Sequence, residues 1–175
     1  NDDEAATLTL LKTVVNDNGG TALDTAFTLT ATRGAFSISG TEGQPAITAA
    51  SVSAGTYALS ESGAATSLYT PGTWVCSAGT LVGGDLTLAA GETASCTLIN
   101  NDKPRITLLK DVVNDDGGAA LDTDFTLTAT RGAVSISGTE GQAAITDAAV
   151  DAGTYALSES GAAASPDTPC TWVCR

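Results

Sequence analysis

The chain contains no histidine and no methionine, and only 15% of its 175 residues are charged. Histidine is the commonest general base of enzymes and the commonest metal ligand, so its absence argues against both kinds of site. Outside one constellation of buried polar residues, the sequence brings no nucleophile, base and acid together. We therefore expect a protein that is not an enzyme and that needs no metal and no cofactor.

Cationic residues are also scarce, with seven Lys and Arg against twenty Asp and Glu, and the net charge is −13. Nucleic acid and anionic membranes repel such a chain. No apolar run approaches the roughly 18 residues of a membrane span, and Asn1-Asp2-Asp3-Glu4 is unlike the basic start of a signal peptide. Because abundant Thr, Ala, Ser and Gly are typical of secreted β-proteins, we expect a processed, extracellular chain with no nucleic acid partner and no membrane insertion.

The sequence nearly repeats itself after 98 residues. Leu8–Lys12 returns as Ile106–Lys110 (110 − 12 = 98), and Gly55–Glu61 returns unchanged as Gly153–Glu159. Solenoid repeats run to about 20 to 50 residues, so a period this long indicates tandem copies of one small domain.

The two copies predict two domains. Residues 1–103 form a complete copy, and residues 104–175 form a second copy that stops at the equivalent of Ser77. The second copy therefore lacks a counterpart of the segment from Ala78 to Asn101.

Short runs of β-branched and apolar residues alternate with polar residues and are separated by turn clusters, with no sustained helical period. This pattern predicts an all-β fold of tandem antiparallel β-sandwiches, Ig-like or prealbumin-like, with the second copy incomplete. The strands expected in the first copy are Thr7–Val15, Phe27–Thr32, Phe36–Ser39, Ala46–Val52, Gly55–Ser60, Thr73–Ser77, Leu86–Leu88 and Ser95–Asn100.

Differences between the copies indicate which side chains reach water, because a change to Asp is tolerated at exposed positions. The six positions that change to Asp are Thr13, Asn18, Ala26, Ala49, Ser53 and Tyr69. Since side chains alternate along a strand, an exposed Thr13 places Lys12 on the inward face.

The same alternation places Glu61 on one face with Tyr57 and Leu59, and Asn100 on one face with Cys96 and Leu98. Three strands therefore each end an apolar stripe with a polar residue: Lys12, Glu61 and Asn100. Because a buried charge without a partner is costly, we expect these three residues to meet. Asn101 points outward by the same argument.

This constellation resembles the CnaB-type, prealbumin-like (SpaA pilin-like) repeats of secreted bacterial adhesins and pilins. The resemblance covers the first copy, and it implies a spontaneous amide bond between Lys12 and Asn100 with Glu61 as the autocatalytic acid and base. Burial favours the neutral amine and the neutral acid that such a reaction needs. The alternative is a buried Lys12–Glu61 ion pair capped by Asn100.

Cys76 and Cys96 lie on strand-like runs and predict a disulfide, because zinc would need four ligands and histidine is absent. In the second copy, Cys170 and Cys174 lie about 13 Å apart on a straight strand, too far for a disulfide. Either the strand bends there or both thiols react outside this chain.

The second copy keeps Lys110 and Glu159 of the constellation but has no equivalent of Asn100. Truncation of a longer array is one interpretation. The other is that an open sheet edge accepts a strand from another copy, head to tail, and so builds a homopolymer.

The sequence as a whole favours an extracellular structural module of a bacterial surface adhesin stalk or self-assembling fibre. The alternative is a carbohydrate-binding or host-protein-binding module presented on repeats. A presenting module would concentrate the differences between its copies in one cluster of loops. The differences here are scattered Ala, Ser, Thr and Asp exchanges, which favours the structural interpretation.

Overall fold

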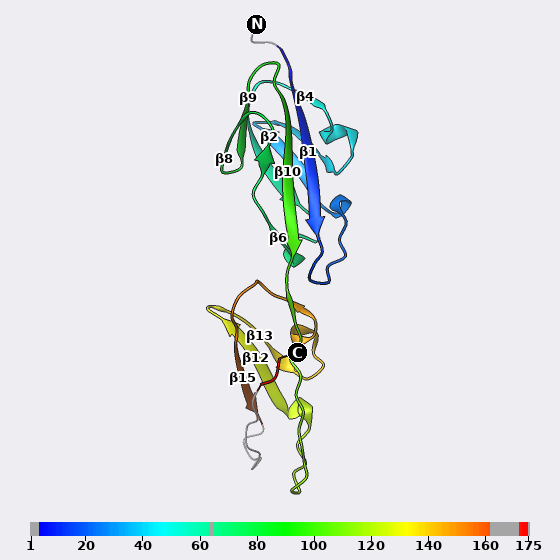
Figure 1. The fold of residues 1–175 in the computed structure, drawn as a ribbon, viewed down its shortest axis with the longest axis vertical. Helices are drawn as coiled ribbons and strands as arrows, with labels where there is room; N and C mark the ends of the chain where they lie inside the picture. Colours follow the sequence, from blue (N-terminus) through cyan, green and yellow to red (C-terminus); the bar gives the residue numbers. More distant parts are fainter. Residues whose placement is uncertain (1–3, 64, 162–171, 175) are drawn as a thin grey trace. The chain divides into compact units, whose positions relative to one another are not determined.

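A computed structural model describes residues 4–63, 65–161 and 172–174 (Figure 1). The chain divides into two compact units, Asn1–Lys103 and Pro104–Arg175. The described residues form strands and short 3-10 turns, and among them no helix is long and apolar enough to cross a membrane.

The first unit contains two sheets. One has the order β4-β1-β10-β6, with β7 also paired to β10, and the other has the order β3-β2-β5-β9-β8. The strands of the first sheet are β1 (Ala6–Val15), β4 (Ala50–Val52), β6 (Tyr69–Pro71), β7 (Val75–Cys76) and β10 (Thr93–Asp102). Those of the second sheet are β2 (Thr28–Arg33), β3 (Phe36–Thr41), β5 (Gly55–Ser62), β8 (Thr80–Val82) and β9 (Asp85–Leu88).

The core lies between the two sheets because each long strand alternates apolar and polar residues. Leu8 and Leu10 of β1 and Cys96 of β10 are buried against Leu29 of β2 and Tyr57 of β5. One face of each sheet is thus removed from water, as in a sandwich. The predicted all-β sandwich is confirmed.

One pairing differs from the antiparallel expectation. β1 and β10 run side by side in parallel, with Lys12 opposite Leu98 and Val14 opposite Asn100, whereas every other pairing described is antiparallel (Figure 1). Parallel neighbours need a long connection, and here the rest of the unit supplies it. The first and the last long strand of the unit are therefore direct neighbours.

Several predicted boundaries were wrong. The expected strand Ala46–Val52 begins instead as a 3-10 turn, η2 (Pro45–Ile47), and becomes a strand at β4. The fixed φ and missing N–H of Pro45 suit a first helical turn, but the second unit forms the same turn, η5 (Ala143–Ile145), with alanine in that place, so proline is not required. The short strands β6 and β8 were not predicted, since three residues between turns carry too little periodicity to be recognised.

Tyr69 was predicted to be exposed, and this was wrong. Its side chain is only 3% exposed and packs edge-on against Phe27, with ring centroids 5.4 Å apart. The hydroxyl donates to the Asn16 side chain at 2.6 Å and accepts from the Ala22 amide at 2.9 Å. A change to Asp at the repeat-equivalent position 167 therefore did not report exposure, and that position lies outside the described residues.

Asp102, the last residue of β10, holds the loop that follows β1. Its carboxylate accepts hydrogen bonds from the backbone amides of Asp17, Asn18 and Gly20. Burial acts to raise the pKa of Asp102, but the hydrogen bonds from Gly20 and Asn18 lower it, and the net result is a pKa below 3.8.

This loop anchor predicts a pH dependence of stability. The ionised Asp102 carboxylate stabilises the first unit above pH 3.8, and that contribution is lost as the pH falls through the lower pKa of the folded state. We expect Asp102→Asn to be less stable than the parent at pH 7 and to lose less stability below pH 4. The curves of unfolding free energy against pH for the two proteins should therefore converge at low pH. Urea unfolding across this pH range, with Asp85→Asn as the control, measures the effect.

The second unit repeats part of this plan. Its sheet β13-β12-β15 corresponds to β3-β2-β5, and the pair β11-β14 corresponds to the start of β1 with β4. The bounds are β11 (Arg105–Ile106), β12 (Phe125–Arg131), β13 (Val134–Thr139), β14 (Ala148–Ala149) and β15 (Ala156–Gly161). Residues 107–113 do not form a strand. Their counterparts in the first unit belong to β1 and pair with β10.

Candidate functional site: a buried lysine, glutamate and asparagine

Three strands of the first unit bring Lys12, Glu61 and Asn100 together in the core. Lys12 comes from β1 and Asn100 from the neighbouring β10, while Glu61 comes from β5 in the opposite sheet. Lys12 Nζ donates to Glu61 Oε2 at 2.6 Å, and Asn100 Nδ2 donates to Glu61 Oε1 at 2.7 Å. One carboxyl group therefore bridges the amine and the amide.

The site is shielded from water. The side chain of Lys12 is 0% exposed and that of Glu61 8% exposed, and Asn100 is fully buried. Lys12 Nζ lies 4.6 Å from the centroid of the Phe27 ring, whose face attracts a cation. Low local polarity strengthens each of these contacts and makes an unpaired charge costly.

Burial governs the protonation of the lysine. Desolvation lowers the pKa of Lys12 below its ordinary value of 10.5, even though the hydrogen bond and the charge of Glu61 act to raise it. Lys12 therefore loses its proton more easily than an exposed lysine, and the neutral amine that results is the nucleophilic form.

Asn100 has one polar atom that this arrangement does not satisfy. Its Oδ1 is buried and has no hydrogen-bond partner among the described residues. Such an orphaned acceptor is rare in a protein core and is costly to keep. The side-chain amide of Asn100 is thus held by its nitrogen only, with its carbonyl left free to be polarised.

Two further carboxylates hold the backbone of β1 beside Lys12, and sequence reasoning missed both. Glu42 accepts from the Lys12 amide at 2.5 Å, and Asp24 accepts from the Val14 amide at 2.7 Å. Their repeat equivalents Glu140 and Asp122 make the same contacts to Lys110 and Val112. An acidic residue retained in corresponding loops of both copies was the signal that could have identified them.

A disulfide lies farther along the same sheet. Cys76 of β7 and Cys96 of β10 are directly opposite each other in the antiparallel pair, and they are bonded. Trp74 packs against the same core cluster as Cys76. The disulfide joins a very short strand to the strand that also carries Asn100.

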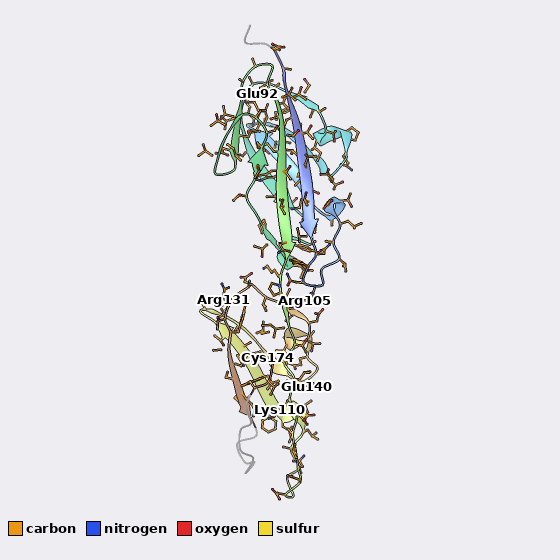
Figure 2. The ribbon with its side chains drawn as sticks, viewed as in Figure 1. Glu92, Arg105, Lys110, Arg131, Glu140 and Cys174 are labelled. Carbon is orange, nitrogen blue, oxygen red and sulfur yellow. A yellow bond between two sulfur atoms is a disulfide. The ribbon has the colours of Figure 1, made fainter. Side chains whose placement is uncertain are left out.

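The second unit holds two of the three residues of the polar site. Lys110 and Glu159 form an ion pair at 3.0 Å, and Lys110 Nζ lies 4.6 Å from the Phe125 ring centroid. Their side chains are 17% and 31% exposed, more than those of Lys12 and Glu61. Glu140, which binds the backbone of Lys110, is labelled beside it in Figure 2.

The two remaining cysteines are not equally described. Cys174 is exposed and carries a free thiol, while Cys170 lies outside the described residues. No group of three or more His, Cys, Asp or Glu side chains in the described part of the chain is placed to hold a metal ion.

The fold and this site define a class of tandem β-sandwich repeats, of which the first has a lysine, a carboxylate and an asparagine in its core. The model of the SpaA-type prealbumin-like fold domain family matches residues 3–98 and again residues 101–175. Because these matches cover nearly the whole chain, the chain belongs to this family, and the predicted resemblance is confirmed. No curated protein and no solved structure gives a match.

Proposed function

We propose that this chain is an extracellular structural module of a bacterial surface adhesin stalk or fibre, stapled by its disulfide and by an amide bond between Lys12 and Asn100. The observation that carries the proposal is the bridging carboxyl of Glu61, which holds both reacting groups in a buried site. Membership of a prealbumin-like family with pilin-type repeats supports the structural role and the surface location.

The proposed bond forms without any co-reactant. Glu61 takes a proton from Lys12, and the free Nζ attacks Cγ of Asn100 while the protonated Glu61 polarises the amide. In the tetrahedral intermediate, Glu61 gives its proton to Nδ2 and takes the second proton from Nζ. The Cγ–Nδ2 bond then breaks, and the departing ammonia takes that proton away as ammonium, which leaves Glu61 as a carboxylate again. One amine and one primary amide become one secondary amide and one molecule of ammonia. This is a single turnover of the chain on itself and not enzymatic activity.

Lys12 and Asn100 lie on the two strands through which tension would act on the first unit. The chain enters the unit along β1 and leaves it along β10, so tension between the ends of the unit acts on these neighbouring strands. An amide from Lys12 to Asn100 would carry that load directly. The 87 residues between them (100 − 12 − 1 = 87) could then not be extended. Resistance to force and to proteases is the property that a stalk needs.

The same proposal includes association with other copies of the chain, head to tail. An unpaired strand segment is a template for a further strand. Residues 107–113 are the counterparts of the part of β1 that pairs with β10, and they form no strand in the described part of the second unit. Addition of this kind does not close on itself, so it would extend a fibre.

Intact mass spectrometry of the purified chain tests the crosslink. We expect a mass about 17 Da below that calculated from the sequence, beyond the loss from the disulfide, because one ammonia departs. Tryptic mapping should place the loss on a branched peptide that joins Lys12 to Asn100. Asn100→Ala should restore the full calculated mass, whereas Asn101→Ala, on the exposed face of β10, should not. An unchanged mass in the parent chain would leave the ion pair as the correct description.

A further inference from the structure

The loop that follows β1 carries the one Asn-Gly dipeptide of the sequence, Asn18-Gly19. This loop lies beside the end of β10 (Figure 1), where the Asp102 carboxylate accepts hydrogen bonds from the amides of Asp17, Asn18 and Gly20. Among the described residues, none accepts a hydrogen bond from the Gly19 amide. Gly19 is exposed at φ +88°, and apart from its chain neighbours no atom lies within 4 Å of the place of a Cβ. The backbone nitrogen that follows Asn18 is therefore open to water and free to react.

The side chain of Asn18 is held entirely through its amide nitrogen. Nδ2 donates to Asp17 Oδ1 at 2.7 Å, to the backbone oxygen of Asp102 at 3.2 Å and to Asp102 Oδ1 at 3.3 Å. All three partners are acceptors, so the position suits a nitrogen that donates and not an oxygen. The hydrogen bonds from the loop lower the pKa of Asp102, so its carboxylate is ionised at neutral pH. A carboxylate at position 18 would therefore face two other negative charges.

We propose that Asn18 is a site of spontaneous deamidation, and that its conversion to aspartate or isoaspartate releases the loop after β1 from Asp102. The Gly19 nitrogen gives its proton to water and attacks Cγ of Asn18. The Cγ–Nδ2 bond then breaks, ammonia leaves, and a cyclic imide is formed. One water opens the imide at either of its two carbonyls. One water is consumed and one ammonia is released, so the chain gains about 1 Da.

The second unit shows that the loop itself accepts an aspartate. Asp116 occupies the place of Asn18, and the glycine after it keeps a φ of +91°. The side chain of Asn114 still closes the loop, with Nδ2 donating to the Ala120 oxygen at 2.9 Å. Asn16 makes the equivalent contact in the first unit at 3.0 Å. The cost of an aspartate at position 18 therefore arises from the carboxylate at the end of β10 and not from the loop.

Ageing the purified 175-residue chain in mildly alkaline buffer, followed by peptide mapping, tests the reaction. We expect Asn18 to convert at least about tenfold faster than the exposed Asn101, because glycine leaves the attacking nitrogen unshielded, and isoaspartate should be among the products. Asn18→Gln should show no conversion at position 18, since its longer side chain must close a larger ring. The gain at Asn18 is separate from any loss of ammonia at Lys12 and Asn100. Equal rates at Asn18 and Asn101 would overturn the proposed site.

Asn18→Asp reproduces the charge of the product and tests the consequence. We expect it to lower the folding equilibrium constant of the first unit by about tenfold at pH 7, because Asp102 and Asp17 lose a donor and gain a like charge. In an Asp102→Asn background, the same change should lower that constant by less than about twofold. Urea unfolding followed by the fluorescence of Trp74, with Trp172→Phe in every variant, gives the values for this double-mutant cycle. Equal losses in the two backgrounds would overturn the release from Asp102.

Discussion

Replacing Glu61 by Ala is expected to abolish the mass loss of about 17 Da and to bring the first unit close to unfolding. Lys12 would remain in the core without a counter-charge, which costs about 3 to 5 kcal/mol. Loss of the amide would also open an 88-residue loop (100 − 12 = 88), which contributes about 4.6 kcal/mol more in the chain-entropy description. Together these losses approach the whole stability of a domain of this size, about 5 to 15 kcal/mol.

The pH dependence of this variant follows from the lysine. Burial lowers the pKa of Lys12 below 10.5, so between the folded-state pKa and 10.5 the unfolded chain binds more protons than the folded one. The stability of Glu61→Ala should therefore rise as the pH is raised through this window. Thermal unfolding followed by the fluorescence of Trp74, with Trp172→Phe as background, measures the first unit separately.

The second unit supplies a matched control for this experiment. Glu159→Ala removes the equivalent carboxylate from an ion pair whose side chains are 17% and 31% exposed. We expect it to cost about 1 kcal/mol or less, since exposure screens the lost interaction. Similar losses in Glu61→Ala and Glu159→Ala would contradict a special role for the buried site of the first unit.

The comparison of the two copies predicted the inward direction of Lys12, and alternation with apolar neighbours predicted that of Glu61 and Asn100, because side-chain alternation along a long strand is set by geometry alone. The short distances between them could not be predicted from alternation, since that requires knowing which strands are neighbours. In particular, the parallel pairing of β1 and β10 depends on how the whole unit closes, which no local pattern encodes.

The wrong prediction for Tyr69 and the residues that the sequence analysis missed have physical reasons of their own. Tyr69 was misjudged because the comparison assumed the same environment at both copies, whereas its burial depends on contacts with Asn16 and Phe27. Glu42 and Asp24 were missed because they accept hydrogen bonds from backbone amides, and the sequence does not show which backbone amide a carboxylate binds; their retention in both copies was the one signal available.

The disulfide and the proposed amide bond both join β10 to other parts of the first unit. Cys96 fixes its middle to β7, Asn100 fixes its far half to β1 and β5, and Asp102 fixes its end to the loop after β1. A strand tied at three points to separate parts of the unit cannot leave without disrupting each of them.

Removing the disulfide with Cys76→Ala and Cys96→Ala together is expected to lower the free energy of unfolding of the first unit by about 3 kcal/mol. The two cysteines are 20 residues apart, and a loop of that length restricts the unfolded chain by about this amount. The fold should persist, because Leu8, Leu10 and Leu29 still form the core between the sheets. Urea denaturation followed by Trp74 fluorescence should show a lower midpoint with little change in slope. Cys174→Ala, which removes an exposed free thiol, should leave the midpoint unchanged.

The double variant should still show the loss of about 17 Da, the mass of one ammonia, because the disulfide does not contact Lys12 or Glu61. A double variant as stable as the parent would show that the disulfide adds nothing to a unit already closed by its amide.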